Sequence, residues 1–159
     1  MSKTDKLDID VKSYEDVIKA LFISCDDIIR ILDYISCNED VFYKLPVIQR
    51  SIEHLLVDVG EILKLVGGNI EPGKHSKNKP VRMSTSDRDR VRSVIECTED
   101  QIKAAKRLRN LISHDPYHRY NLSDVWRYAY NDIPTFYQNL YDAYHAIPDV
   151  EPRCRLISK

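Results

Sequence analysis

Apolar residues recur at alternating steps of four and three along two long stretches of the chain. From Tyr14 the apolar positions are Ile18, Leu21, Cys25, Ile28, Leu32 and Ile35. After Pro46 the same spacing runs through Ile48, Ile52, Leu55, Val59, Ile62 and Val66, up to Gly67 and Gly68. This spacing puts one apolar stripe on a helix, and glycine commonly follows a helix end. The pattern predicts helices over about residues 13–36 and 46–66, joined by a short link as an antiparallel hairpin.

A loop and a third helix are expected next. Residues 69–83 contain two prolines, a glycine and several basic side chains, which predicts a basic loop. Residues 84–86 offer N-caps, and Asp87 follows in the first turn, where a helix dipole favours negative charge. A third helix is therefore predicted to about residue 114. Pro116 disfavours helical dihedrals at the residue before it, so His114 should lie in the last turn or just past it.

Two further helical signals follow along the chain. Ser123 and Asp124 predict the start of a fourth segment, and Asp132 with Pro134 can begin or kink another. The apolar positions of this last stretch are Ile133, Tyr137, Leu140, Tyr144 and Ile147. Amphipathic segments without an alternating strand pattern predict an all-α fold, an up-and-down bundle of four to five helices.

Composition indicates a single globular domain over residues 1–159, with an irregular tail at 148–159. The 24 Lys and Arg nearly balance the 25 Asp and Glu, so an anion site must be local. No stretch approaches the roughly 18 to 20 apolar residues of a membrane span, and the first ten residues lack the apolar run of a secretory signal. We therefore expect a cytoplasmic protein without membrane association. The four cysteines are far apart, and Cys25 is expected in the core.

One position interrupts the apolar stripe of the third predicted helix. Counting back from Arg109 in steps of four and three reaches Ala105, Ile102, Thr98, Ile95 and Val91, and counting forward reaches Ile112. Arg109 should therefore lie in a contact seam of the bundle. A guanidinium buried there without a partner would be strongly unfavourable. The sequence predicts that Arg109 meets a carboxylate, another subunit or a phosphate.

A polar ridge lies on the same helix, roughly opposite the seam. The ridge consists of Lys103, Arg107, Asn110 and His114. It could be only a solvated helix face. On an ideal helix Arg109 and His114 are about 140° apart, so either the helix ends before His114 or a second copy of the helix completes a site across a two-fold axis. We favour the composite site, because a self-associating face also accommodates a seam arginine.

These residue types suit RNA cleavage without a metal ion, in which the 2′-hydroxyl attacks the neighbouring phosphate. His114 can move a proton near neutral pH, Arg109 can neutralise the phosphorane, and Asn110 can donate hydrogen bonds. The sequence has no acidic pair of the kind that holds magnesium and no histidine pair at zinc-binding helical spacing. No cofactor is therefore expected.

The segments RNLISH (109–114) and VWRYAYNDIPTFYQNL (125–140) resemble the HEPN family, in particular the HepT-like toxins of HepT/MNT toxin–antitoxin pairs. YEDVIKALFISCDDIIRIL and VIQRSIEHLLVDVGEILKL also resemble that family's first two helices. The resemblance implies an all-α homodimer whose motif is Arg109, Asn110 and His114. It also implies a metal-independent endoribonuclease, neutralised by a minimal nucleotidyltransferase antitoxin.

In that family the antitoxin can modify a tyrosine two residues after the histidine. Pro116 holds this position here, so Tyr117 is the first candidate and Tyr120 the second, with simple packing as the alternative for both. His118 and Arg119 extend the basic patch and, with Lys103 and Arg107, are candidates for contact with the RNA backbone.

Two alternatives to an RNA-cleaving enzyme stay open. In one, the chain is a non-catalytic HEPN-like module whose arginine and histidine grip a nucleotidyltransferase or a nucleotide. In the other, Arg109 pairs with a bundle carboxylate such as Glu53 or Glu61, and the domain is an interaction scaffold.

Overall fold

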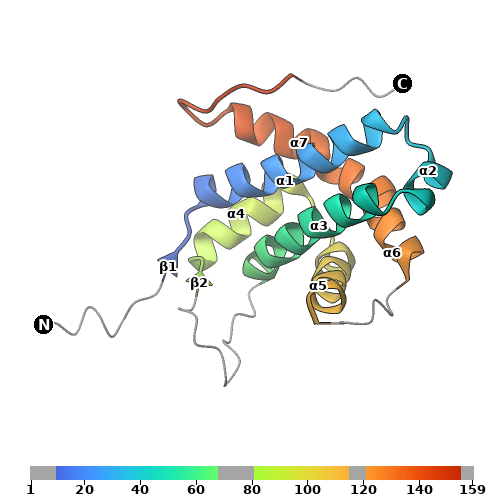
Figure 1. Ribbon diagram of the computed structural model, residues 1–159. Coiled ribbons are helices and arrows are strands. Elements are labelled where there is room, and N and C mark those ends of the chain that lie inside the picture. Colours follow the sequence, from blue (N-terminus) through green and yellow to red (C-terminus); the bar gives the residue numbers. More distant parts are fainter. Residues whose placement is uncertain (1–9, 68–80, 115–120, 155–159) are drawn as a thin grey trace, which may run out of the picture.

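A helical hairpin forms the centre of the computed structural model, which describes residues 10–67, 81–114 and 121–154. Helices α1 (Tyr14–Tyr34) and α3 (Pro46–Val66) run antiparallel, with the short helix α2 (Glu39–Lys44) in the link between them (Figure 1). A capping box of Ser13 and Asp16 begins α1. The two predicted helices and their hairpin are confirmed.

The region predicted as one third helix is broken into two. Helix α4 (Thr85–Ile95) ends at Glu96, whose φ of 55° is left-handed, and α5 (Glu99–His114) begins three residues later. Thr98 and Gln101 exchange hydrogen bonds between side chain and backbone, which is a second capping box. The prediction of an uninterrupted helix over residues 84–114 is therefore wrong. The prediction that Thr98 lies in the contact seam is also wrong, because Thr98 is exposed.

The last helical region bends where the sequence indicated a kink. Helix α6 (Leu122–Arg127) continues through a π-helical turn (Tyr128–Asp132) into α7 (Ile133–His145). Pro134 lies in the first turn of α7, and its missing N–H interrupts the regular α-helical hydrogen bonds. All five apolar positions predicted for this stretch are buried.

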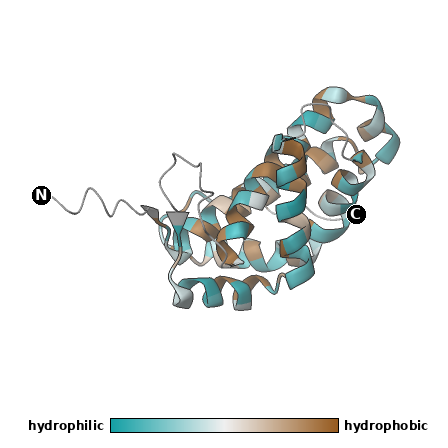
Figure 2. Ribbon diagram, turned by 90° about the horizontal axis from the view of Figure 1, so that it is seen from below, coloured by the Kyte–Doolittle hydropathy of each residue, from teal (hydrophilic) through white to brown (hydrophobic). Residues whose placement is uncertain are grey.

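The core lies between α1 and the helices that surround it. Helix α1 packs against α3, α4 and α7, while α5 lies along the outer side of α3 (Figure 1). Apolar residues face the inside of the bundle and polar residues its surface (Figure 2). Cys25 is fully buried, as predicted. None of the helices in the described ranges has the length and apolarity needed to cross a lipid bilayer.

Two short strands accompany the helices. β1 (Asp10–Val11) pairs in parallel with β2 (Val81–Arg82), and the backbone N–H of Lys12 donates to the carbonyl of Arg82 at 2.8 Å. The sequence had assigned residues 81–83 to the basic loop. The pairing depends on backbone groups far apart in the chain, which an alternation pattern over two residues cannot reveal. It does not change the fold class, which is all-α.

The chain after α7 forms neither helix nor strand as far as residue 154, but it is bound to α1. Asp26 is completely buried and accepts hydrogen bonds from the hydroxyl of Tyr137 (2.6 Å), from Arg30 (2.8 Å) and from Arg153 (2.9 Å). Burial by itself raises the pKa of Asp26, but these hydrogen bonds outweigh it and hold the pKa below its usual value. The same carboxylate thereby joins α1, α7 and the C-terminal segment.

Candidate functional site

Arg109 lies at the contact between α5 and α3, where the sequence placed it. Its Nε–H donates to the Oε1 of Glu61 on α3 at 2.6 Å, and its Nη2 forms an ion pair with the same oxygen. Its Nη1 donates to the Oδ1 of the neighbouring Asn110 at 2.8 Å. Of the three partners that the sequence allowed for this arginine, the structure of the single chain provides a carboxylate.

The pair of Arg109 and Glu61 is at the surface of the chain. The arginine side chain is 21% exposed and the glutamate side chain 48% exposed. Solvent therefore reaches both charges, and the guanidinium is not enclosed among apolar groups. Each terminal nitrogen of the guanidinium carries two hydrogens. Among the described residues, Nη1 donates one of them to Asn110 and Nη2 is ion-paired with Glu61, so further hydrogens can be donated to an anion.

A glycine lets α5 approach α3 this closely. A Cβ at Gly60 would lie 2.4 Å from the Cβ of Arg109 and 2.7 Å from the carbonyl oxygen of Ala105. Both are parts of α5 that cannot move without moving the helix. The absence of a side chain at Gly60 therefore sets where the base of the Arg109 side chain lies. A lone glycine inside an apolar helical pattern was the available signal for this close approach.

His114 is the last residue of α5, and its side chain is exposed. The prediction that it lies in the last turn of the helix is confirmed. Because α5 is helical through His114, the imidazole does not swing back after an early helix end. Residues five apart on a continuous helix are about 140° apart around its axis. Within the chain, the imidazole and the guanidinium of Arg109 therefore leave the helix in different directions.

The predicted polar ridge is a real surface feature. It comprises four exposed side chains of α5, which are Lys103, Arg107, Asn110 and His114. Since the Oδ1 of Asn110 accepts from Arg109, its amide nitrogen can donate to a bound group. Asn110 therefore links the Arg109 side of α5 to the exposed ridge.

Four other candidates fall outside the described residues, namely Tyr117, His118, Arg119 and Tyr120. Trp126 is buried and stacks on Tyr130, so its ring belongs to the core and is not available to stack on a base. His145 has a structural role, because its Nδ1 lies 2.8 Å from the carbonyl of Tyr141 and its Nε2 accepts from the backbone N–H of Arg153.

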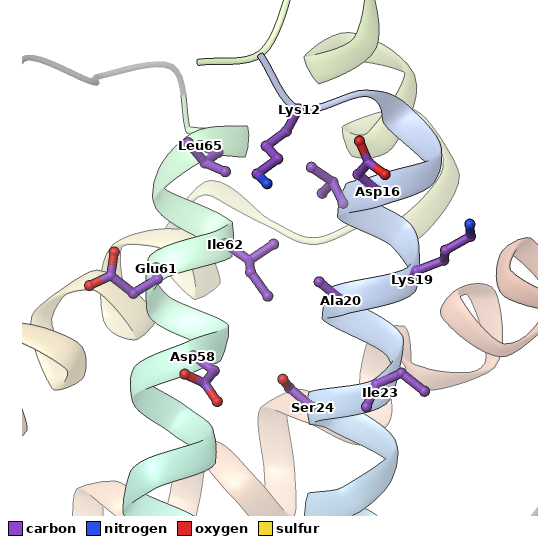
Figure 3. A pocket seen from close by; sticks show the side chains of 11 residues that line it. Lys12, Asp16, Lys19, Ala20, Ile23, Ser24, Asp58, Glu61, Ile62 and Leu65 are labelled. Carbon is purple, nitrogen blue, oxygen red and sulfur yellow. The ribbon is translucent and has the colours of Figure 1, made fainter. Parts of the chain in front are cut away.

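A groove of about 730 Å³ lies between α1 and α3. In Figure 3, Ile62 points toward α1, whereas Glu61 leaves α3 on the other side, where α5 lies. The groove is lined by Lys12, Asp16, Val17, Lys19, Ala20, Ile23, Ser24, Asp58, Glu61, Ile62 and Leu65. Among the described residues its lining includes no histidine, and Arg109 contacts Glu61 from the side of α3 where α5 lies. We therefore do not assign the groove to the candidate site.

The arrangement on α5 suits binding of a phosphodiester. It offers a guanidinium with outward donors, an amide, an imidazole and two further cations on one exposed helix. Within the described ranges, no three His, Cys, Asp or Glu side chains gather in a group that could hold a metal ion.

Comparisons with known proteins gave one match. A family model described as "Ribonuclease HepT-like" matches residues 8–142 of the chain. Neither curated proteins nor solved structures gave a significant match. The matched range includes α5 and therefore every residue of the arginine–histidine motif.

Proposed function

Since the chain belongs to the HepT-like ribonuclease family, we propose that it is the metal-independent endoribonuclease toxin of a toxin–antitoxin pair. In this proposal it acts as a homodimer in the cytoplasm and is neutralised by a minimal nucleotidyltransferase antitoxin. The observation that carries the proposal is the position of Arg109, Asn110 and His114 on the solvent-accessible part of one helix, within the range that matches the ribonuclease family.

The reaction proposed is transesterification within the RNA strand. The 2′-hydroxyl oxygen attacks the adjacent phosphorus and forms a bond to it, while the bond from phosphorus to the 5′-oxygen of the next nucleotide breaks. A base takes the proton of the 2′-hydroxyl, and an acid delivers a proton to the leaving 5′-oxygen. Arg109 stabilises the extra negative charge of the phosphorane, and Asn110 donates a hydrogen bond to a phosphate oxygen. The products are a 2′,3′-cyclic phosphate and a 5′-hydroxyl.

A dimer can bring a second imidazole to the site, so that the base and the acid need not be the same group. One subunit contributes one His114, whereas two copies related by a two-fold axis contribute two imidazoles to a shared site. A symmetric arrangement also allows the His114 of one subunit to face the Arg109 of the other. This is our reason for a composite site, given that the two side chains leave a continuous α5 about 140° apart.

Further roles belong to the same proposal. Lys103 and Arg107 hold the RNA backbone on either side of the cleaved bond, because both are exposed cations on the ridge. His118 and Arg119 extend this contact. Tyr117, or failing that Tyr120, accepts a nucleotidyl group from the antitoxin. A bulky anionic group that close to His114 would block access of RNA to the site.

The first experiment is an RNA-cleavage assay in EDTA with purified protein. His114→Ala is expected to abolish cleavage while the helical circular dichroism and the dimer mass stay unchanged. His54→Ala is the matched control, since His54 is an exposed histidine on α3. Undiminished cleavage by the His114→Ala protein, with contaminating nuclease excluded, would refute the assignment.

A mixing experiment tests the composite site. Arg109→Ala and His114→Ala homodimers should each be inactive. When their subunits are exchanged, each heterodimer would combine one intact arginine with one intact histidine and regain part of the activity. A strictly monomeric wild-type protein at micromolar concentration, or no recovery in a verified heterodimer, would contradict a shared site.

The second candidate function is a non-catalytic binding module that docks a nucleotidyltransferase or a nucleotide. The observation in its favour is that Arg109 already has a carboxylate partner within its own subunit. The assay in EDTA distinguishes the two functions. Specific RNA cleavage that disappears with His114→Ala supports the enzyme, whereas saturable nucleotide or partner binding without cleavage supports the module.

A further inference from the structure

We infer that Glu61 is a positioning residue for Arg109, holding the guanidinium so that its outer edge faces the reacting phosphate. This inference rests on the ribonuclease function proposed above and adds a residue from a different helix. Glu61 lies on α3, 48 positions before Arg109, outside the arginine–histidine motif. Through Glu61, α3 therefore helps to position the guanidinium that acts in the reaction.

Among the described residues, the contacts of the Arg109 guanidinium leave some of its N–H groups available. Glu61 takes the inner edge, where Nε and Nη2 both reach its Oε1, and Asn110 takes one hydrogen of Nη1. Nη1 and Nη2 each carry a second hydrogen, which can be donated to a phosphate oxygen. Two partners from two helices thus fix both the direction and the rotation of a long, otherwise flexible side chain.

The backbone on either side of the contact is also fixed. Glu61 follows Gly60, and the backbone of Gly60 is packed against the Cβ of Arg109 and the carbonyl of Ala105. The two ends of the ion pair therefore start from positions that α3 and α5 cannot change independently. Positioning a charged donor in advance lowers the barrier, because no reorganisation is needed when negative charge develops.

A contribution to folding stability does not by itself explain the ion pair between Glu61 and Arg109. The Glu61 side chain is 48% exposed, and ion pairs at that exposure contribute little to folding. As a negative charge beside the phosphate site, Glu61 also opposes ground-state binding of RNA. Its removal should therefore not raise KM, whereas loss of a correctly held Arg109 should lower kcat.

The test compares three variants of the full-length protein on one RNA substrate. Glu61→Ala removes the acceptor and should lower kcat about tenfold without raising KM. Glu61→Gln keeps an oxygen that can accept from Nε and should restore most of that loss. Asp58→Ala is the matched control, because it removes a carboxylate about one turn earlier on α3 and leaves the contact of Glu61 with Arg109 in place. Its kcat should stay within about twofold of wild type.

A spectroscopic readout reports on the contact without any turnover. In wild-type protein and in Asp58→Ala, the Nε–H of Arg109 should give a slowly exchanging NMR signal, assigned by its loss in Arg109→Lys. In Glu61→Ala this signal should broaden or disappear while the thermal unfolding midpoint stays close to that of wild type. A signal that persists in Glu61→Ala would overturn the positioning contact.

The kinetic outcomes separate this inference from the proposed function. If wild type does not cleave RNA, the ribonuclease proposal fails. If wild type cleaves and His114→Ala does not, but Glu61→Ala keeps wild-type kcat, the ribonuclease proposal stands and the role of Glu61 is refuted. A raised KM with unchanged kcat in Glu61→Ala would likewise refute it, because the residue would then serve substrate binding.

Discussion

The backbone of Gly60 on α3 rests directly against the Cβ of Arg109 on α5. No Cβ fits between them, because it would lie 2.4 Å from the arginine Cβ. The next residue, Glu61, holds the guanidinium of the same arginine. One close helix–helix contact thus places both the base and the tip of the side chain that we propose to stabilise the phosphorane.

Gly60→Ala should therefore affect stability and activity together. The added methyl must push α5 away from α3, which we expect to cost about 1–3 kcal/mol of unfolding free energy and to lower RNA cleavage. Urea denaturation and the cleavage assay measure the two effects. Gly67→Ala is the control, since the nearest atom to its Cβ would be a side-chain methyl of Ile102, at 3.2 Å, the nearest backbone atom would lie 3.4 Å away, and its φ of −72° suits alanine. Equal behaviour of the two variants would contradict a special contact at Gly60.

Arg153 should contribute to stability although it lies beyond the last helix. Its Nη1 donates to Asp26 at 2.9 Å and to Asp27 at 2.8 Å, binding the C-terminal segment to α1. We expect Arg153→Ala to lower the free energy of unfolding by about 1–3 kcal/mol, because Asp26 is fully buried and loses one of its donors. Arg127→Ala removes a well-exposed arginine whose nearest carboxylate is 3.7 Å away, and should change stability by less than about 0.5 kcal/mol.

Asp26 should also make stability depend on acid pH. Its pKa is lowered in the folded protein, so its charged form stabilises the fold above the ordinary carboxyl pKa of 3.8. That contribution is lost as the pH falls from this value through the folded-state pKa. Compared with wild type, Asp26→Asn should unfold at lower urea concentration at pH 7, and the difference should shrink below about pH 4. A difference that is constant between pH 7 and pH 3 would disprove the linkage.

The four cysteines should divide into two reactivity classes. Cys25 and Cys97 are buried, and burial raises the pKa of Cys97 to about 12 and that of Cys25 further still. Cys37 and Cys154 are exposed. A thiol reagent at pH 8 should label the exposed pair in native protein and the buried pair only in denaturant, because the thiolate is the reactive form. Mass spectrometry of labelled peptides identifies each site, and rapid native labelling of Cys25 would contradict the packed core.

Lys103 and Arg107 should contribute to RNA affinity through charge alone. Replacing each with alanine should weaken binding at low salt and reduce the slope of log affinity against log salt by about 0.7 for each lost phosphate contact. Lys44→Ala, which removes an exposed lysine at the end of α2, is the control. Binding is measured with catalytically inactive His114→Ala as the background. An unchanged salt slope would mean that the ridge does not touch the RNA backbone.

The local sequence pattern was sufficient to predict the two long helices and the positions of Arg109 and His114 on their helix. The apolar spacing from Tyr14 to Ile35 and from Ile48 to Val66 predicted two long helices. This was possible because the helical period depends only on residues close together in the sequence. The same reasoning placed Arg109 at a helix contact and His114 in the last turn of α5. It missed the break after Ile95, because Thr98 fits the apolar register by position while its side chain caps α5.

Only the tertiary structure decided which groups meet. In the folded chain, Glu61 is the carboxylate that binds Arg109, and Gly60 packs against α5. Asp26 binds Arg153 although 126 residues separate them in the sequence. These contacts depend on how helices that are far apart in the sequence pack against one another. From the sequence alone, several residues could serve equally well as the partner of each charge. The sequence therefore indicates that Arg109 needs a partner, because its charge lies at a helix contact. The packing of α3 against α5 determines that this partner is Glu61.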